Sequence, residues 1–220
     1  MSGPTVSAPG DALPGWYGKI PALGDFASRR LPPDFVQPWD AWLQQAMRAG
    51  RAALDEAWQA AYLNCPVWRF GLLPGVCGRT GWAGIMLPSV DKVGRYFPLT
   101  VAVALAPQPA MLAAVFAAHD WFGAIEQAAL ASLRLDATLD EFERALAAAP
   151  YRAAPAAAAA SEAAACARHA LSGAATGKSL WWRGEAGAGA AVLECAGLPP
   201  PGRFALLLTG PGPASRPGPG

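Results

Sequence analysis

The chain has 220 residues, of which 53% are hydrophobic and nine are tryptophan, enough material for one domain with a large buried core. Its formal net charge at pH 7 is +1, from 17 lysines and arginines against 16 acidic residues. Proteins that bind nucleic acids or anionic membranes usually carry an excess of positive charge or a basic run, and this nearly neutral chain has neither. We therefore expect neither kind of partner.

No targeting or membrane-spanning segment is visible. Residues 1–10 have neither a positively charged start nor an apolar stretch, so they do not predict a signal peptide. The longest apolar region, Leu99–Phe122, is interrupted by Pro107, Pro109 and His119 and does not predict a spanning helix. We expect a cytoplasmic protein without membrane insertion.

The cysteines are widely spaced and form no C-x-x-C pair: Cys65, Cys77, Cys166 and Cys195. In a chain without a signal peptide, this spacing favours reduced core thiols over a disulfide framework.

Composition divides the chain into a domain and two tails. Residues 1–14 and 210–220 consist largely of Gly, Pro and other small residues, which cannot bury enough apolar surface to offset the entropy of ordering. They are predicted to be disordered tails. Residues 15–209 are predicted to form a single α/β domain.

The first clear element is an amphipathic helix that begins near Pro38. Apolar residues follow the helical spacing i, i+3, i+4, i+7 and i+8 at Trp39, Trp42, Leu43, Ala46 and Met47. The pattern continues past Gly50 to Tyr62, which predicts one long helix that bends at the glycine.

Three apolar runs separated by short turn segments come next, at residues 67–73, 82–87 and 96–105. Their connections are too short for parallel crossovers, so they predict an antiparallel meander.

Helices then return, followed by a hairpin. Residues 109–133 are apolar over a broad arc, and Thr138-Leu139-Asp140-Glu141 is a capping box that begins another helix. A further helix is predicted from about Ala156. A hairpin of residues 179–183 and 190–194 follows, and residues 204–208 form a closing short helix or strand. About six strands with helices before and after the meander predict an α/β sandwich with a mixed or antiparallel sheet.

Two segments resemble catalytic or cofactor motifs but lack their required spacing or partners. Residues 173–179 resemble a P-loop, but the spacing is one residue short and a helix precedes the segment, so a helix end is the better interpretation. Of the two histidines, only His169 has a metal-ligand neighbour, Cys166, and this pair lacks companions. We expect no metal and no cofactor.

Loop residues form the one polar set that could carry chemistry: Asp25, Arg29, Ser89, Asp91 and Arg95. Two carboxylates and two guanidinium groups in one cleft could bind a phosphate or a cation. Alternatively, the carboxylates accept backbone N–H groups in turns and the arginines pair with them. We favour the second interpretation.

Seven short motifs occur in a fixed order: Gly18–Phe26 (GKIPALGDF), Pro32–Asp40, Cys65–Phe70, Pro74–Gly78, Pro88–Leu99 (PSVDKVGRYFPL), Ser179–Trp182 and Gly197–Phe204. Together they resemble the TagF family of proteins associated with type VI secretion systems, over nearly all of the folded part. The departures are an Ala-rich middle region and Cys65 in place of a small hydroxyl residue. Motif residues to which we assign structural roles are Gly18, Lys19, Pro21, Trp68, Arg69, Phe70, Pro88, Gly94, Tyr96, Phe97, Pro98, Trp181 and Trp182.

The resemblance implies a three-layer α/β sandwich and a cytoplasmic bacterial protein that represses type VI secretion after translation. It also implies a partner, the forkhead-associated scaffold protein of the apparatus, in or beside a threonine-phosphorylation pathway. Some members are fused to the PP2C-type phosphatase of that pathway. No catalytic residues come with the resemblance, so we do not expect an enzyme.

Partner contacts are expected in the loops, at Gly24, Asp25, Phe26, Arg29, Ser89, Asp91 and Arg95. Structural turn roles are an equal alternative for these residues. Two other functions remain open: a hydrolase or phosphatase-like enzyme that uses the loop carboxylates, or a structural subunit of the secretion apparatus.

Overall fold

The computed structural model describes residues 12–106, 111–152, 176–184 and 192–209. Within these residues, one antiparallel sheet has the strand order β2-β1-β5-β4-β3-β6-β7. Its strands are β1 (Gly15–Gly18), β2 (Ala27–Arg29), β3 (Trp68–Leu72), β4 (Gly81–Leu87), β5 (Leu99–Leu105), β6 (Lys178–Trp182) and β7 (Leu193–Ala196).

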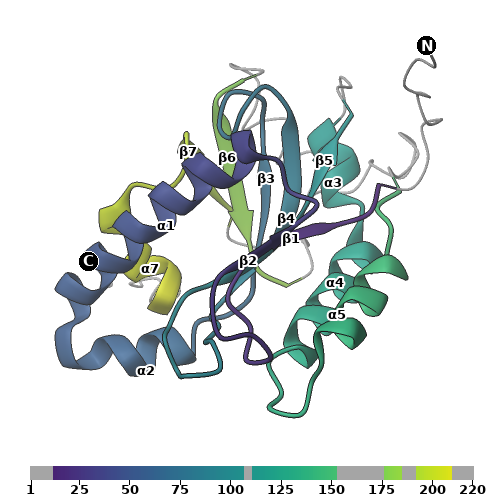
Figure 1. The fold of residues 1–220 in the computed structure, drawn as a ribbon. Coiled ribbons are helices and arrows are strands. Elements are labelled where there is room, and N and C mark those ends of the chain that lie inside the picture. Colours follow the sequence, from purple (N-terminus) through teal and green to yellow (C-terminus); the bar gives the residue numbers. More distant parts are fainter. Residues whose placement is uncertain (1–11, 107–110, 153–175, 185–191, 210–220) are drawn as a thin grey trace, which may run out of the picture.

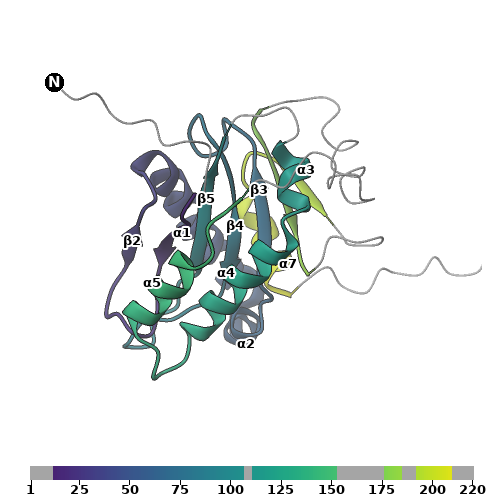
Figure 2. The same ribbon diagram turned by 90° about the vertical axis from the view of Figure 1, so that its right-hand side faces the viewer.

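Helices cover both faces of this sheet (Figures 1 and 2). One face carries α1 (Pro33–Leu54), α2 (Trp58–Leu63) and α7 (Phe204–Thr209), with short 3-10 helices at Asp55–Ala57 and Pro201–Arg203. The other face carries α3 (Met111–Phe116), α4 (His119–Ala131) and α5 (Leu139–Ala147). The predicted three-layer α/β sandwich is therefore confirmed.

Strand alternation produces two separate hydrophobic cores, because successive side chains point to opposite faces. Trp181 packs between Trp39 and Trp42 of α1, whereas its neighbour Trp182 packs on Phe122 of α4. Both tryptophans are fully buried by helices. This burial agrees with the structural roles predicted for both tryptophans.

The first predicted helix differs from the observed one in where it begins and where it is interrupted. The first helix begins at Pro33 rather than near Pro38, and it is continuous through Gly50. A β-carbon at Gly50 would lie only 3.2 Å from the ring of Phe204 on α7, so this glycine allows close helix packing. The break comes at Asp55, whose φ of +43° ends α1 before the short 3-10 turn and α2.

Two other predicted boundaries shift. The single helix expected over residues 109–133 is two helices, α3 and α4, separated at residues 117–118. The third run of the meander becomes a strand at Leu99, because residues 96–98 form the end of a loop with Pro98. Both strands of the N-terminal hairpin, β1 and β2, were missed, since they are short and rich in glycine and polar residues.

Other predictions are confirmed. The meander is β3–β4–β5, and β6 pairs with β7. The Thr138 hydroxyl accepts the Glu141 N–H at 3.2 Å while the Glu141 carboxylate accepts the Thr138 N–H at 2.9 Å, so the capping box begins α5. The closing segment is the helix α7.

The predicted helix from Ala156 and both predicted tails, apart from residues 12–14, lie outside the described residues. None of the described helices combines the length and the apolar character that crossing a membrane requires.

Candidate functional site

Two loops meet at one end of the sheet through a buried ion pair. Lys19 directly follows β1, and Asp91 lies in the loop between β4 and β5. The Lys19 Nζ atom lies 2.8 Å from Asp91 Oδ2, and the two side chains are 5% and 0% exposed. Arg95 donates from Nε to the same oxygen at 2.6 Å. One carboxylate thus joins two cations from different segments.

The Asp91 carboxylate also organises its own loop. Its Oδ1 atom accepts the backbone N–H groups of Val93 at 3.1 Å and Arg95 at 2.9 Å. Burial alone would raise the pKa of Asp91, but hydrogen bonds from Lys19 and Arg95 hold that pKa well below its ordinary value. Asp91 is therefore ionised at neutral pH, with both oxygens engaged within the protein.

Ser89 connects the loops to α2. Its hydroxyl donates to the Lys19 carbonyl at 2.6 Å, and its backbone N–H donates to the Tyr62 oxygen at 2.9 Å. The Tyr62 hydroxyl in turn donates to the Ser89 carbonyl at 2.8 Å. Ser89 is 4% exposed, so it supports the loops from within.

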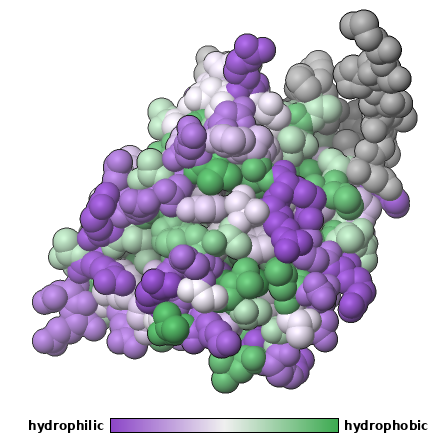
Figure 3. Space-filling model, viewed as in Figure 1, coloured by the Kyte–Doolittle hydropathy of each residue, from purple (hydrophilic) through white to green (hydrophobic). Residues whose placement is uncertain are grey.

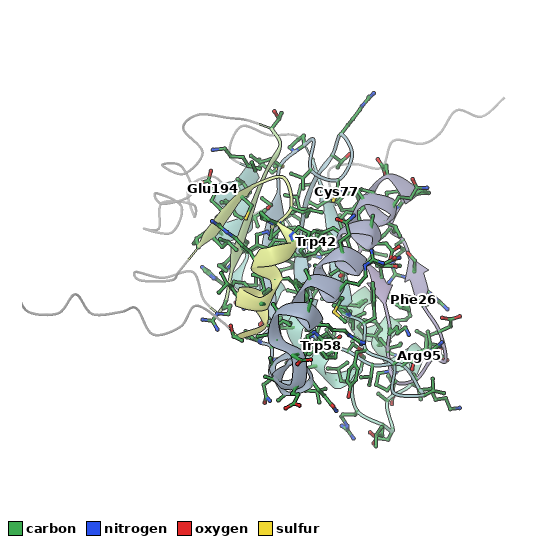
Figure 4. The ribbon with its side chains drawn as sticks, turned by 90° about the vertical axis from the view of Figure 1, so that its left-hand side faces the viewer. Phe26, Trp42, Trp58, Cys77, Arg95 and Glu194 are labelled. Atoms are coloured by element: carbon green, nitrogen blue, oxygen red, sulfur yellow. The ribbon has the colours of Figure 1, made fainter. Side chains whose placement is uncertain are left out.

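Asp25, Phe26 and Arg95 form the exposed part of this arrangement, which we call the loop surface. Phe26 is 46% exposed and packs edge-on against Phe97, with 4.6 Å between ring centroids. Lys19 Nζ lies 4.6 Å from the centre of the Phe26 ring, a cation–π distance. Figure 4 shows Phe26 and Arg95 at the same end of the molecule, away from Cys77 and Glu194.

Polar contacts hold the loop surface in one geometry. Arg95 donates from Nη2 to the Gly24 carbonyl at 2.7 Å, and the Asp25 carboxylate accepts the Phe26 N–H at 2.8 Å. The Asp25 and Arg95 side chains approach to 3.9 Å. In Figure 3, a view with α1 on the left and α4 and α5 on the right as in Figure 1, hydrophilic residues are interspersed with smaller hydrophobic areas.

The structure brings six of the seven predicted contact residues together and places Arg29 elsewhere. Arg29 lies on β2 and approaches Glu143 of α5 at 3.8 Å, on the sheet face opposite to Phe26. Glu143 also accepts hydrogen bonds from Arg30 and from the Trp16 indole. The sequence contained no signal for this second cluster, because its members are far apart in the chain.

The two loop carboxylates do not face a common pocket. The Asp25 side chain is 79% exposed, whereas Asp91 is fully buried. A groove of about 290 Å³ lies beside the loops, and it is lined mainly by apolar residues, including Pro21, Leu63, Cys65 and Leu130. Ser89 is the only predicted contact residue along it. Among the described residues, no group of three or more His, Cys, Asp or Glu side chains is placed to hold a metal ion.

More than half of the chain matches a known protein family. The sequence model of the TagF N-terminal domain, described as type VI secretion system-associated, matches residues 15–149. The chain belongs to the TagF family. This stretch contains both loops and the whole Lys19–Asp91–Arg95 arrangement, and it links the protein to type VI secretion systems.

A solved structure resembles the chain over a longer stretch. The chain is similar to PA0076 from Pseudomonas aeruginosa PAO1, whose crystal structure was determined at 2.05 Å resolution. The two sequences are 38% identical, the TM-score is 0.76, and the match covers 94% of this chain and 99% of that one. No curated protein matches the chain significantly.

The TagF motif residues with predicted structural roles lie mostly in the cores. Trp68 donates its indole N–H to the Leu207 carbonyl at 2.8 Å, which attaches α7 to the sheet. Arg69 pairs with Glu126 on α4 through two hydrogen bonds. The remaining buried members are Gly18, Lys19, Phe70, Phe97, Pro98, Trp181 and Trp182.

The sequence did not reveal the hydrogen bonds by which two tyrosines support the loops. Tyr62 was recognised only as an apolar helix position, yet its hydroxyl makes both bonds to Ser89. Burial raises the pKa of Tyr62 far above its ordinary value, so the hydroxyl stays protonated and remains a donor. Tyr96 accepts a hydrogen bond from Gln59 of α2 at 2.8 Å. A helical pattern identifies such residues as buried but does not reveal their polar partners.

The described cysteines are expected to be unreactive thiols. Cys65, Cys77 and Cys195 are free, and burial raises the pKa of Cys65 and of Cys77 to about 12. At pH 8, the thiolate fraction of Cys65 should therefore be about 10³-fold lower than that of a thiol at its ordinary pKa. We predict alkylation of Cys65 and Cys77 that is slower than alkylation of glutathione by at least this factor, measured by mass spectrometry.

The measurement uses the variant Cys166→Ser. Cys166 lies outside the described residues, so its substitution restricts the labelling to the cysteines that the prediction concerns. The same sample in denaturant should label fully and serves as the control. Rapid labelling of Cys65 in the native protein would contradict the expectation.

Proposed function

We propose that the protein is a cytoplasmic, post-translational negative regulator of a type VI secretion system and acts by binding the forkhead-associated scaffold protein. Its action lies in or beside the threonine-phosphorylation pathway, to which the PP2C-type phosphatase also belongs. The functional unit is the single domain of residues 15–209. Membership of the TagF family is the observation that carries this proposal.

The geometry of the loops favours binding over catalysis. All the acceptor positions that Asp91 presents are directed to Lys19, Val93 and Arg95, so this carboxylate serves the loop rather than a substrate. Asp25, the other loop carboxylate, is exposed and accepts the next backbone N–H. A hydrolase or phosphatase-like site built on these two residues would need both to face one substrate.

We infer that regulation is by sequestration. The loop surface is exposed, and the Lys19–Asp91 pair and the Ser89–Tyr62 hydrogen bonds hold it in place. A preorganised surface loses little conformational entropy when a partner binds, which favours a stable complex. The scaffold protein held on this surface would be kept from the assembling apparatus.

The test is secretion of the needle-tube protein into the culture medium. The encoding gene is deleted, left native, or overexpressed in the same strain, and the intracellular amount of tube protein is measured alongside. A repressor predicts more secretion on deletion and less on overexpression, with constant intracellular tube protein. A structural subunit predicts the opposite effect of deletion, and that result would refute the proposal.

Binding is measured separately with the purified scaffold protein. A stable complex with the wild-type chain is expected by calorimetry. If the protein represses secretion but forms no such complex, the regulatory role stands and the scaffold protein is refuted as its partner.

A further inference from the structure

We propose that Arg95 and Phe26 together dock an acidic side chain, Asp or Glu, of the partner protein next to an apolar residue. The inference rests on the proposed function and specifies the chemistry of the surface that the partner must present.

Arg95 is held in a fixed orientation with one of its nitrogen atoms still available. Its Nε atom bonds to Asp91 and its Nη2 atom bonds to Gly24, while the side chain remains 56% exposed. Within the part of the chain that the structure describes, no hydrogen bond reaches Nη1. A guanidinium group that is already oriented loses less entropy when it binds an anion, and it suits the planar carboxylate.

The charges around Arg95 leave a positive excess. Lys19 and Arg95 converge on the single buried carboxylate of Asp91, which balances only one of them. Lys92 adds a further exposed cation in the same loop. Asp25 is the acidic residue nearest to Arg95 on the surface, but its carboxylate lies 3.9 Å away, beyond hydrogen-bond distance, and is 79% exposed. Asp25 therefore compensates Arg95 weakly, and an incoming carboxylate can take its place.

One guanidinium group with a single available nitrogen atom, Nη1, is matched to one side-chain carboxylate. Phosphoryl groups are typically bound by clusters of arginines, which this loop lacks among the described residues. We therefore assign the anion to Asp or Glu.

Phe26 supplies the apolar half of the surface. Its ring rests on Phe97 and on the Lys19 ammonium group, which fix its position while almost half of it faces solvent. Arginine and large aromatic side chains are typical of the residues that carry most binding energy at protein interfaces. An apolar residue beside the partner's carboxylate would cover Phe26 and shield the charged contact from water.

The experiment compares three variants of the full chain by calorimetry with the purified scaffold protein. Arg95→Gln is expected to weaken binding by at least about tenfold, because the charged contact is lost. Asp25→Asn is expected to strengthen binding by about twofold to fivefold, since it removes a competing carboxylate. Arg134→Gln is the matched control: Arg134 is also exposed and paired, with Asp136 at 2.7 Å, but lies in the α4–α5 turn.

The outcomes separate the inference from the proposed function. Equal effects of Arg95→Gln and Arg134→Gln, or weaker binding by Asp25→Asn, would overturn the inference and leave the proposed function standing. Loss of binding after phosphatase treatment of the scaffold protein would overturn the carboxylate assignment. If the wild-type chain does not bind the scaffold protein, the proposed partner fails and the inference fails with it. If Arg95→Gln disturbs the loop, Asp25→Asn still tests the inference, because its predicted effect is stronger binding.

Discussion

Replacement of Gly18 by alanine should prevent stable folding, whereas the same change at Gly24, in the same motif, should be tolerated. Gly18 has a φ of +132°, and a β-carbon there would lie 2.1 Å from the Pro98 carbonyl oxygen. This clash is with backbone, so it can be relieved only by separating the two loops. We expect Gly18→Ala to cost more than about 4 kcal/mol of unfolding free energy.

Gly24 is the internal control for this experiment. It is exposed, and a β-carbon at Gly24 would meet no atom within 4 Å, so Gly24→Ala should change stability by less than about 0.5 kcal/mol. Soluble yield and urea unfolding of the two variants give the comparison. Similar stability of both variants would show that the approach of β1 to Pro98 is not required.

Removal of either member of the Lys19–Asp91 pair should release the loop surface and thereby abolish the proposed repression. Lys19→Met leaves the buried Asp91 carboxylate with Arg95 alone, and Asp91→Asn leaves a buried ammonium group without its counter-charge. In both variants we expect hydrogen exchange of the Val93 and Arg95 amides to accelerate by at least about tenfold. Asp136→Asn, which breaks the exposed Arg134–Asp136 pair, is the control and should leave these amides unchanged.

The pH dependence of stability provides a second readout for Asp91. Its folded-state pKa lies below the ordinary value of 3.8, so the ion pair contributes stability above that pH and loses it as pH falls toward the folded-state pKa. The stability difference between the wild type and Asp91→Asn should therefore be largest near neutral pH and shrink below about pH 3.8. A difference that stays constant from pH 7 to pH 3 would contradict the assignment of an ionised Asp91.

Hydrophobic patterns along the chain determined the elements of the fold. The spacing of Trp39, Trp42 and Leu43 predicted α1, and the short connections of the meander predicted antiparallel pairing. These predictions succeeded because burying one face of a helix or strand requires a periodic sequence. The Thr138–Glu141 capping box was also readable, since its partners are three residues apart.

Glycines were harder to interpret from sequence alone. Gly50 suggested a bend because glycine is flexible, but α1 is continuous there and Gly50 packs against Phe204. Gly18 and Gly24 look alike in their shared motif, and only the position of Pro98 distinguishes them. The role of a glycine depends on what approaches it, which is a property of the fold.

The sequence by itself determined the family, the α/β class and the two loops in which polar residues gather. Tertiary structure alone decided which of those residues act together: Lys19 joins Asp91 across 72 positions, while Arg29 turns away to Glu143. It also divided the loop set into buried supports and the exposed residues Asp25, Phe26 and Arg95. The physical reason is that hydrophobic periodicity is a local property, whereas ion pairs and exposure depend on segments that meet only after folding.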